Sequence, residues 1–299
     1  MNYGLTEIQK NKIIEKWGQD FYSKILKYID IYSKKWNLSD FEFVEYYSFN
    51  AIFFCKSELY GDCVLKIYGE PSEYNALREY NNSGKFCKVF ECDLENIIML
   101  IERIIPGKML KDEPALEKRL AIFSELFNGL HIEPKNPEVP DSCGICTYTD
   151  WVINTADYII SKLEDNKELY VHALKAKEIY LEMVSVYDKK LLLHGDLHFD
   201  NIISCGNEKY KIIDPFGWTG DPIFEIGRYI SQEYWQADSK ERFNIVDKIS
   251  DYFEISLDIP KKISKQCFYI DITICNSWIV KDGFTANMND VRFAKNVLN

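Results

Sequence analysis

Apolar residues recur at steps of three or four over residues 6–36, a pattern typical of one or two amphipathic helices. Residues 41–57 and 63–69 are instead dense in aromatic and β-branched side chains and are separated by the turn sequence ELYGD, which indicates strands. Good helix formers follow at 71–82, and 84–103 contains two further apolar runs around a turn. The predicted order is three strands, a helix and two strands.

A Pro-Gly break in IIPGKML, residues 104–110, separates this segment from a longer one with helical periodicity. Its main predicted helices are 116–132, 148–163 and 168–188. Asp221 and Pro222 then offer an N-cap and a first-turn proline for another helix. We therefore expect an α+β, bilobal chain. Residues 1–103 form a small lobe with leading helices and an antiparallel sheet, and residues 104–299 form a larger, mainly helical lobe.

The composition is that of a folded chain, and its charge argues against some partners. The 299 residues carry a formal net charge of -11, with 46% hydrophobic and 28% charged residues. Binding to nucleic acid is not expected, because phosphate neutralisation needs a clustered basic surface. No apolar run is long enough to predict a membrane span. Nine cysteines without a regular framework, after an N-terminus unlike a signal peptide, predict a cytoplasmic protein with mostly free thiols.

The densest polar motif is LLLHGDLHFDN, residues 191–201, which predicts a strand, a loop that carries Asp196, and a second strand after Asn201. Thirteen residues further on, Ile212-Ile213-Asp214 ends another short apolar run, so Asp214 can face the same space. Two carboxylates and an amide would then converge. Hard oxygen ligands of this kind suit Mg²⁺, which keeps some waters and is completed by substrate phosphates.

Phosphoryl transfer needs a group that orients the attacking hydroxyl, ligands for Mg²⁺ and a cation on the nucleotide phosphates. Asp196 would accept the hydroxyl proton, while Asn201 and Asp214 would hold Mg²⁺. Lys66, in the predicted strand CVLKIY, would contact the α- and β-phosphates. Glu73, in the first turn of the following helix, would pair with Lys66 and fix its position.

The motifs HGDLHFDN and IIDPFGWTGDP resemble those of the aminoglycoside phosphotransferase family, which has the protein-kinase-like fold. The resemblance implies a bilobal kinase that uses ATP and Mg²⁺, with Asp196 as catalytic residue and Asn201 and Asp214 as metal ligands. It covers most of residues 41–230. Within the family, Ile-Asp-Pro followed by Gly-Asp-Pro is most similar to the streptomycin-type phosphotransferases.

The same resemblance extends the nucleotide site to the segment MLIERIIPG, where the family binds adenine through backbone groups. Here these groups would lie around Ile101 and Arg103. Residues 41–62 contain no GxGxxG pattern, so the turn near Ser48 is expected to cover the phosphates. The choice between ATP and GTP stays open.

The acceptor is expected to be a small, cationic, hydroxylated molecule such as an aminoglycoside. Residues 131–166 contain seven acidic residues and two lysines, and in the family's layout this segment borders the acceptor pocket. A solvated acidic face is the alternative interpretation. The acceptor candidates are Asp150, Trp151, Glu225, Glu233 and Trp235.

Other interpretations were weighed for the motif and for the whole chain. A metallophosphatase-like site at His194 and His198 fails, because the chain has four histidines and none follows His198. His194 is expected to brace the loop. The same machinery would also fit a metabolite kinase of the choline, homoserine or sugar type, and a catalytically silent nucleotide-binding protein is the third hypothesis. The oligomeric state is not predicted.

Overall fold

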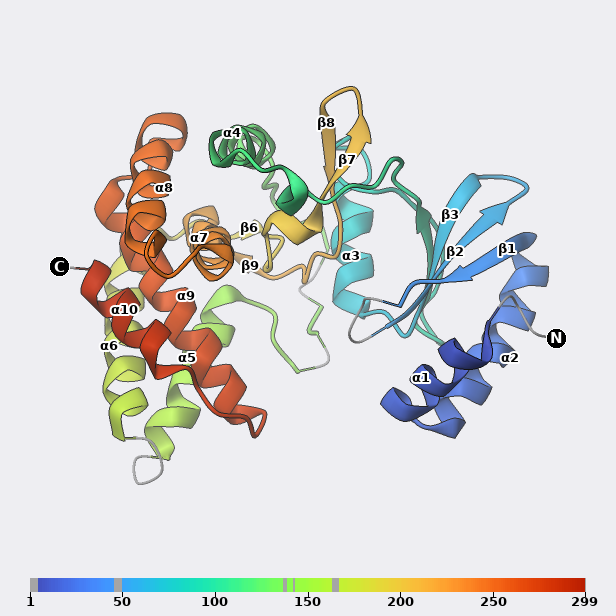
Figure 1. The fold of residues 1–299 in the computed structure, drawn as a ribbon, viewed down its shortest axis with the longest axis horizontal. Coiled ribbons are helices and arrows are strands. Elements are labelled where there is room, and N and C mark those ends of the chain that lie inside the picture. The colour runs from blue at the N-terminus through green and yellow to red at the C-terminus, as the bar shows by residue number, and fades with distance from the viewer. Residues whose placement is uncertain (1–4, 46–49, 137–138, 142, 163–166, 299) are drawn as a thin grey trace.

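The chain forms a smaller N-terminal lobe around one sheet and a larger C-terminal lobe built mainly of helices (Figure 1). The computed structural model describes residues 5–45, 50–136, 139–141, 143–162 and 167–298. The expected α+β, bilobal fold class is confirmed. The exact boundary after residue 103 stays a prediction, although the last strand of the sheet ends at Glu102.

Two helices open the chain, α1 (Glu7–Trp17) and α2 (Gln19–Lys35), where the apolar spacing predicted one or two. Thr6 begins α1 with a capping box, in which its hydroxyl accepts from Gln9 N and the Gln9 side chain accepts from Thr6 N. Gly18 separates the helices with a φ of 89°, a conformation that side chains other than glycine rarely adopt.

The N-terminal sheet is antiparallel, with the strand order β1-β2-β3-β5-β4. Its strands are β1 (Leu38–Phe43), β2 (Ala51–Ser57), β3 (Gly61–Ile67), β4 (Val89–Asp93) and β5 (Ile98–Glu102). Helix α3 (Pro71–Tyr80) lies between β3 and β4 in the chain. The predicted order of three strands, a helix and two strands is therefore confirmed.

Alternation along the strands gives this sheet two different faces. Leu65 and Ile98 point to the face that packs with α1 and α2. Lys66 and its cross-strand neighbour Met99 point to the opposite face, where Met99 joins the cluster that contains Leu77 of α3. A one-residue shift in register would turn Lys66 away from α3, so the apolar pattern of β3 fixes where its charge lies.

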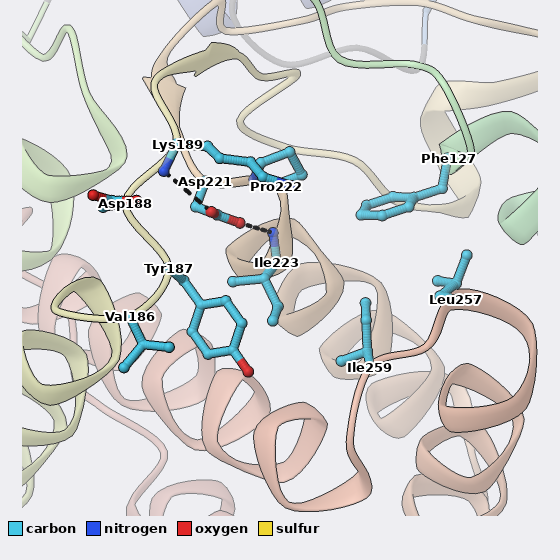
Figure 2. A pocket seen from close by; sticks show the side chains of 10 residues that line it. All are labelled: Phe127, Val186, Tyr187, Asp188, Lys189, Asp221, Pro222, Ile223, Leu257 and Ile259. Carbon is cyan, nitrogen blue, oxygen red and sulfur yellow. Dashed lines mark hydrogen bonds between the residues drawn. The ribbon is translucent and has the colours of Figure 1, made fainter.

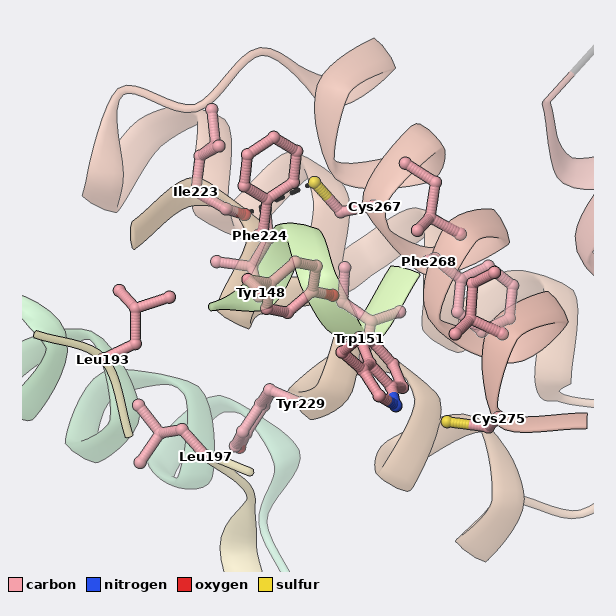
Figure 3. Packing of buried hydrophobic residues seen from close by; sticks show 14 of the residues in the cluster. Tyr148, Trp151, Leu193, Leu197, Ile223, Phe224, Tyr229, Cys267, Phe268 and Cys275 are labelled. Atoms are coloured by element: carbon pink, nitrogen blue, oxygen red, sulfur yellow. Dashed lines mark hydrogen bonds between the residues drawn. The ribbon is translucent and has the colours of Figure 1, made fainter. Parts of the chain in front are cut away.

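Most of the C-terminal lobe surrounds one buried helix, α9 (Lys261–Lys281). Around it lie α5 (Tyr148–Ser161), α6 (Lys167–Val184), α7 (Glu225–Gln236), α8 (Arg242–Leu257) and α10 (Met288–Val297). Helix α4 (Leu116–Phe127) packs on α8. Figure 3 shows the aromatic part of this core, in which Tyr148, Trp151 and Phe224 pack beside Cys267 of α9.

Four short strands lie between α6 and α7 in the chain, as the pattern of residues 190–222 predicted. β6 (Leu191–Leu192) pairs with β9 (Thr219–Gly220), and β7 (Ile202–Gly206) pairs with β8 (Lys209–Ile212). A 3-10 turn, η2 (Phe199–Asn201), precedes β7. Because β7 and β8 are antiparallel, the residues just before β7 and just after β8 meet at one end of the hairpin.

Two predicted helices are shorter than expected. The helix predicted at 116–132 ends at Phe127, because Gly129 adopts a φ of 67° and Lys85 of the N-terminal lobe donates to the carbonyl of Leu126. The helix predicted at 168–188 ends at Val184. Beyond α4 the apolar periodicity continues because Leu130 is buried in the loop that follows, whereas Val186 beyond α6 is exposed.

Asp221 caps the turn that leads into α7, as predicted. Its carboxylate accepts from Ile223 N at 3.1 Å, at the start of η3 (Pro222–Phe224), and from Lys189 N at 3.2 Å (Figure 2). The pocket in this view has a volume of about 240 Å³. None of the candidate catalytic, nucleotide or acceptor residues lines it. Across the described part of the chain, no helix is long and apolar enough to cross a membrane.

Candidate active site

Lys66, Glu73 and Asp214 meet where the N-terminal sheet faces the β7–β8 hairpin. Lys66 Nζ lies 2.7 and 2.8 Å from the two carboxylate oxygens of Glu73 and 3.0 Å from Asp214 Oδ1. Lys66 and Glu73 are buried, with 3% and 4% of their surfaces exposed. The pairing of Lys66 with Glu73 that we expected from the sequence is therefore present, and Asp214 joins it.

The local sequence explains this cluster. The register of β3 directs Lys66 toward α3, and Pro71 begins α3, so Glu73 lies in its first turn. Burial by itself opposes a charge on Lys66, but Asp214 and Glu73 outweigh it and raise the pKa of Lys66 above its ordinary value. Lys66 is therefore a permanent cation that the structure holds in a fixed place.

Asp196 lies in a tight loop that needs glycine beside it. Gly195 has a φ of 86°, and a Cβ there would lie 2.9 Å from Phe216 Cβ. The backbone N–H of Gly195 donates to Glu225 Oε1 at 2.6 Å, and Glu225 is itself 1% exposed. The other carboxylate oxygen of Glu225 lies 2.6 Å from His131 Nε2. Glu225 thus links the backbone of the Asp196 loop to His131.

His194 braces the same loop, as expected from the sequence. Its Nδ1 accepts from Asp196 N at 3.1 Å, so its Nε2 carries the proton and donates to Ile213 O at 2.8 Å. Burial lowers the pKa of His194, which favours this neutral form. His194 therefore ties the loop of Asp196 to the residue that precedes Asp214.

The carboxylate of Asp196 has a cationic and a polar neighbour. Arg228 Nε lies 3.0 Å from Oδ1, and His198 Nε2 lies 3.3 Å from Oδ2. Burial opposes the charge of Asp196, but His198 and Arg228 outweigh it and lower the pKa of Asp196 to about 2. Arg228 was not among the residues expected from the sequence; its position one helical turn after Glu225 was the available signal.

Asn201 and Asp214 lie at the same end of the β7–β8 hairpin. Ile213 N donates to Asn201 O at 3.0 Å, and Asn201 Nδ2 donates to the carbonyl of Asp196 at 2.9 Å. Asp214 adopts a left-handed backbone with a φ of 57°, which aspartate tolerates better than most residues. The three residues that the motif analysis singled out are therefore brought together.

The donor set of Asn201 and Asp214 fits Mg²⁺, which keeps several waters, better than it fits a metal whose ligands all come from the protein. The amide nitrogen of Asn201 is used by the Asp196 carbonyl, so the amide oxygen is the atom of this side chain that could bind a cation, and Asp214 adds a carboxylate. Among the described residues, no group of three His, Cys, Asp or Glu side chains has the arrangement of a metal site. One amide oxygen and one carboxylate suit a cation that waters and phosphates complete.

Two of the expected nucleotide residues, Lys66 and Ile101, share one face of the sheet. Cross-strand pairing places Val64 opposite Ile101 and Lys66 opposite Met99, so Ile101 and Lys66 face the same side. Arg103 extends over the ring of Phe54, with its Cζ 3.8 Å from the ring centroid. Ser48 lies outside the described residues. An apolar surface therefore adjoins Lys66, as an adenine site requires.

Two of the expected acceptor contacts have internal partners instead. Glu225 accepts from Gly195 N in the loop after β6 that carries Asp196 (the catalytic loop). Glu233 forms a two-pronged pair with Arg119 of α4, with N–O distances of 2.8 and 2.6 Å. Glu233 is 1% exposed and also accepts from Tyr229. An acceptor contact at either carboxylate would require these buried pairs to break, so the structure does not support it.

The remaining acceptor candidates are also engaged. Asp150 closes the capping box at the start of α5, where it accepts from Thr147 N. Trp235 Nε1 donates to Asp290 at 2.9 Å. Trp151 is buried, and its ring lies 6.0 Å from the guanidinium carbon of Arg228. Of the five candidates, Glu225 contacts the catalytic loop directly but is occupied by it, and Trp151 lies beside Arg228, which contacts Asp196.

The fold and this site together define a protein-kinase-like phosphotransferase. The chain belongs to the family of aminoglycoside/hydroxyurea antibiotic resistance kinases, whose model matches residues 67–283. It is accordingly a kinase with an alcohol group as acceptor, and it uses a nucleotide and a small-molecule acceptor.

Known relatives of this chain act on different small molecules. Streptomycin 6-kinase from Streptomyces griseus is 22% identical over 211 residues, which are 70% of this chain and 67% of that protein. Methylthioribose kinase from Escherichia coli O45:K1 is 28% identical over 208 residues, 57% of this chain and 49% of that protein, so this match spans about half of the relative's length.

A solved structure shares the fold. It is a thermostable mutant of the aminoglycoside phosphotransferase APH(4)-Ia in a ternary complex with ADP and hygromycin B. The TM-score is 0.61 at 17% identity, and the match covers 90% of this chain and 95% of the other. Identity this low establishes a common fold and leaves the acceptor to be argued from this chain.

Proposed function

We propose that this protein is an ATP- and Mg²⁺-dependent O-phosphotransferase whose acceptor is a small, cationic, hydroxylated molecule such as an aminoglycoside antibiotic. The observation that carries the proposal is the position of Lys66 Nζ, 3.0 Å from Asp214 on the hairpin that also holds Asn201. Asn201 in turn contacts the backbone of Asp196. A phosphate-binding cation, two oxygen ligands and a base thus lie within one continuous set of contacts.

Each residue has one role in this reaction. Lys66 binds the α- and β-phosphates, and Glu73 keeps its ammonium in place. Asn201 and Asp214 hold Mg²⁺, which neutralises charge on the phosphates when bound. The oxygen of the acceptor hydroxyl attacks the γ-phosphorus, and the proton of that hydroxyl passes to Asp196. ADP leaves. The low pKa of Asp196 keeps it ionised, so its carboxylate can accept a hydrogen bond from the acceptor hydroxyl and orient it; so weak a base takes the proton only as the bond to phosphorus forms.

Ile101, Arg103 and the turn near Ser48 complete the nucleotide site in this proposal. Ile101 supplies apolar surface on the face that carries Lys66, and backbone groups around Ile101 and Arg103 bind adenine. The reaction is placed in the cytoplasm, where ATP is abundant. All nine cysteines are free thiols, which supports a reducing compartment.

A cationic acceptor is supported by charge and by relationship. The chain carries a net charge of -11, which attracts cations. The curated relative from Streptomyces griseus is a streptomycin kinase.

A metabolite kinase is the second candidate. The methylthioribose kinase of Escherichia coli is 28% identical to this chain, a higher identity than that of the streptomycin kinase over a similar number of residues. The same Asp196, Asn201 and Asp214 would serve either acceptor, so the acceptor has to be measured.

The decisive experiment is a coupled ADP-release assay with Mg-ATP, and in parallel Mg-GTP, over a panel of acceptors. Streptomycin, hygromycin B, methylthioribose, choline and homoserine cover the candidates. We expect turnover with an aminoglycoside, and turnover with methylthioribose alone would select the metabolite kinase. The variant Asp196→Asn should bind Mg-ATP and lose turnover. Near-normal rates in this variant would remove Asp196 as the base, and no Mg-ATP binding by the wild type would exclude a kinase.

A further inference from the structure

Helix α7 contacts two consecutive residues of the catalytic loop. Glu225 and Arg228 are one turn apart, so their side chains leave the same side of the helix. Glu225 accepts from Gly195 N at 2.6 Å, and Arg228 Nε lies 3.0 Å from the carboxylate of Asp196. The backbone and the side chain of the loop are therefore each held by a charged residue of α7.

Arg228 is anchored from the opposite side by Asp271 of α9. Asp271 Oδ1 lies 3.6 Å from Arg228 Nε, and Asp271 is 1% exposed. Helices α7 and α9 approach closely here, so that a Cβ on Gly227 would lie 2.5 Å from the carbonyl oxygen of Cys267. The guanidinium also lies over Trp151. Arg228 is thus placed between a buried carboxylate and the catalytic one, with little room to move.

A purely structural role for Arg228 would be to neutralise Asp271, because a buried carboxylate needs a counter-charge. The pair between Arg119 and Glu233 shows how such a role is fulfilled on the same helix, with two short N–O contacts to one carboxylate. Arg228 makes no such two-pronged contact with Asp271. It lies closer to Asp196 than to Asp271, and both distances involve the same nitrogen.

We propose that Arg228, anchored by Asp271, is a positioning residue that holds the carboxylate of Asp196 in the orientation that receives the acceptor hydroxyl. The inference rests on the proposed function, in which Asp196 is the base. Arg228 Nε beside Oδ1 and His198 Nε2 beside Oδ2 flank the carboxylate, and the charge of Arg228 favours this orientation; the Nε–H itself makes no hydrogen bond, so the restraint is the ion pair. Loss of this restraint slows the transfer step and leaves the contacts of Lys66 with the nucleotide intact.

The test compares variants in the ADP-release assay, with the panel acceptor that gives the highest turnover. Arg228→Met alone leaves Asp271 buried without its counter-charge and is expected to unfold at a lower temperature. The informative variant is therefore Arg228→Met with Asp271→Asn, which removes both charges. We expect its kcat to fall by about 10- to 100-fold, while KM for ATP changes by less than about twofold. Arg228→Lys should recover part of the loss.

The matched control is Arg242→Met with Asp290→Asn. Arg242 Nη1 lies 3.5 Å from Asp290 Oδ1, a similar pair between two other helices of the same lobe. It should lower Tm and leave kcat within about threefold of wild type, because neither residue touches Asp196. A double variant at 228 and 271 with kcat near wild type, or an equal fall in the control, would overturn the inference.

Failure of the inference is distinguishable from failure of the proposed function. If Asp196→Asn abolishes turnover and the double variant retains it, Asp196 is the base and Arg228 does not position it. If Asp196→Asn remains active, or if no acceptor in the panel is phosphorylated, the proposed function fails, and the role of Arg228 fails with it.

Discussion

Lys66 Nζ lies 3.0 Å from Asp214 Oδ1, although the two residues are 148 positions apart in the chain. This contact joins the N-terminal sheet to the hairpin that follows the catalytic loop. It also means that two carboxylates, those of Glu73 and Asp214, share one ammonium. In the protein with bound nucleotide, the phosphates and Mg²⁺ would take over part of this balance of charge.

Replacement of Lys66 should therefore strongly reduce kcat. Lys66→Met removes the cation on the phosphates and leaves two carboxylates close together, so kcat should fall by about 100- to 1,000-fold. Lys56→Met is the control, because Lys56 lies on β2 in an exposed pair with Asp40. Steady-state kinetics of both variants test this; equal rates for Lys66→Met and wild type would refute the role of Lys66.

Asp214 should determine the dependence of the rate on Mg²⁺. Asp214→Asn removes one charge from the expected ligand set, so the Mg²⁺ concentration for half-maximal rate should rise by at least about tenfold. Asp200 is a nearby carboxylate that pairs with Lys111 at 2.8 Å. Asp200→Asn should leave the Mg²⁺ titration unchanged, and an equal shift in both variants would argue against a specific ligand role for Asp214.

The pair of Arg119 and Glu233 should contribute to stability and not to acceptor binding. Arg119→Met leaves the carboxylate of Glu233 buried without its counter-charge, which should lower the free energy of unfolding by about 3–5 kcal/mol. Adding Glu233→Gln removes that charge and should restore part of the loss. Urea denaturation measures both, and KM for the acceptor should be unchanged in the double variant. A selective rise in that KM would return Glu233 to the acceptor site.

His194 and His172 should each contribute a decrease in stability between pH 7 and pH 5, whereas the carboxyl of Glu73, whose pKa burial raises to about 7, acts in the opposite direction over the same range. Burial lowers the pKa of His194 and of His172, whereas in the unfolded chain both titrate near the ordinary value of about 6.5. Below that pH these histidines bind more protons in the unfolded chain than in the folded one, so through them acid favours unfolding. The slope is at most about 1.4 kcal/mol per pH unit for each histidine, and less for the partly exposed His172.

Urea denaturation at several pH values checks this dependence. His172→Gln removes one of the two groups without touching the catalytic loop, so its stability should vary less with pH than that of the wild type. An unchanged slope in this variant would show that His172 does not contribute.

Local patterns were sufficient for most of the fold. Apolar spacing predicted helical structure at the start of the chain, and the aromatic and β-branched runs predicted the strands around α3. Helix ends were predicted less well, because the end of α4 depends on Gly129 and on Lys85 from the other lobe. Backbone preference and periodicity act over a few residues, whereas a helix end can be set by a distant side chain.

Helix α7 shows what the sequence could not decide. Its acidic residues Glu225 and Glu233 looked suited to a cationic acceptor, because charged side chains are usually exposed. Packing against the catalytic loop and α4 instead buries both and supplies their partners. The same packing brings Arg228 to Asp196, a contact that no spacing within the motif indicates.

The sequence by itself determined the chemistry that is encoded locally. Asp196 and Asn201 lie five positions apart in one loop. Asp214 follows β8, which pairs with β7 directly after Asn201, so short-range geometry brings the three residues together. Only the tertiary structure decided which further charges surround them. Burial and charge pairing depend on how α7, α9 and α4 pack, and this packing joins residues whose separation along the chain carries no periodic signal.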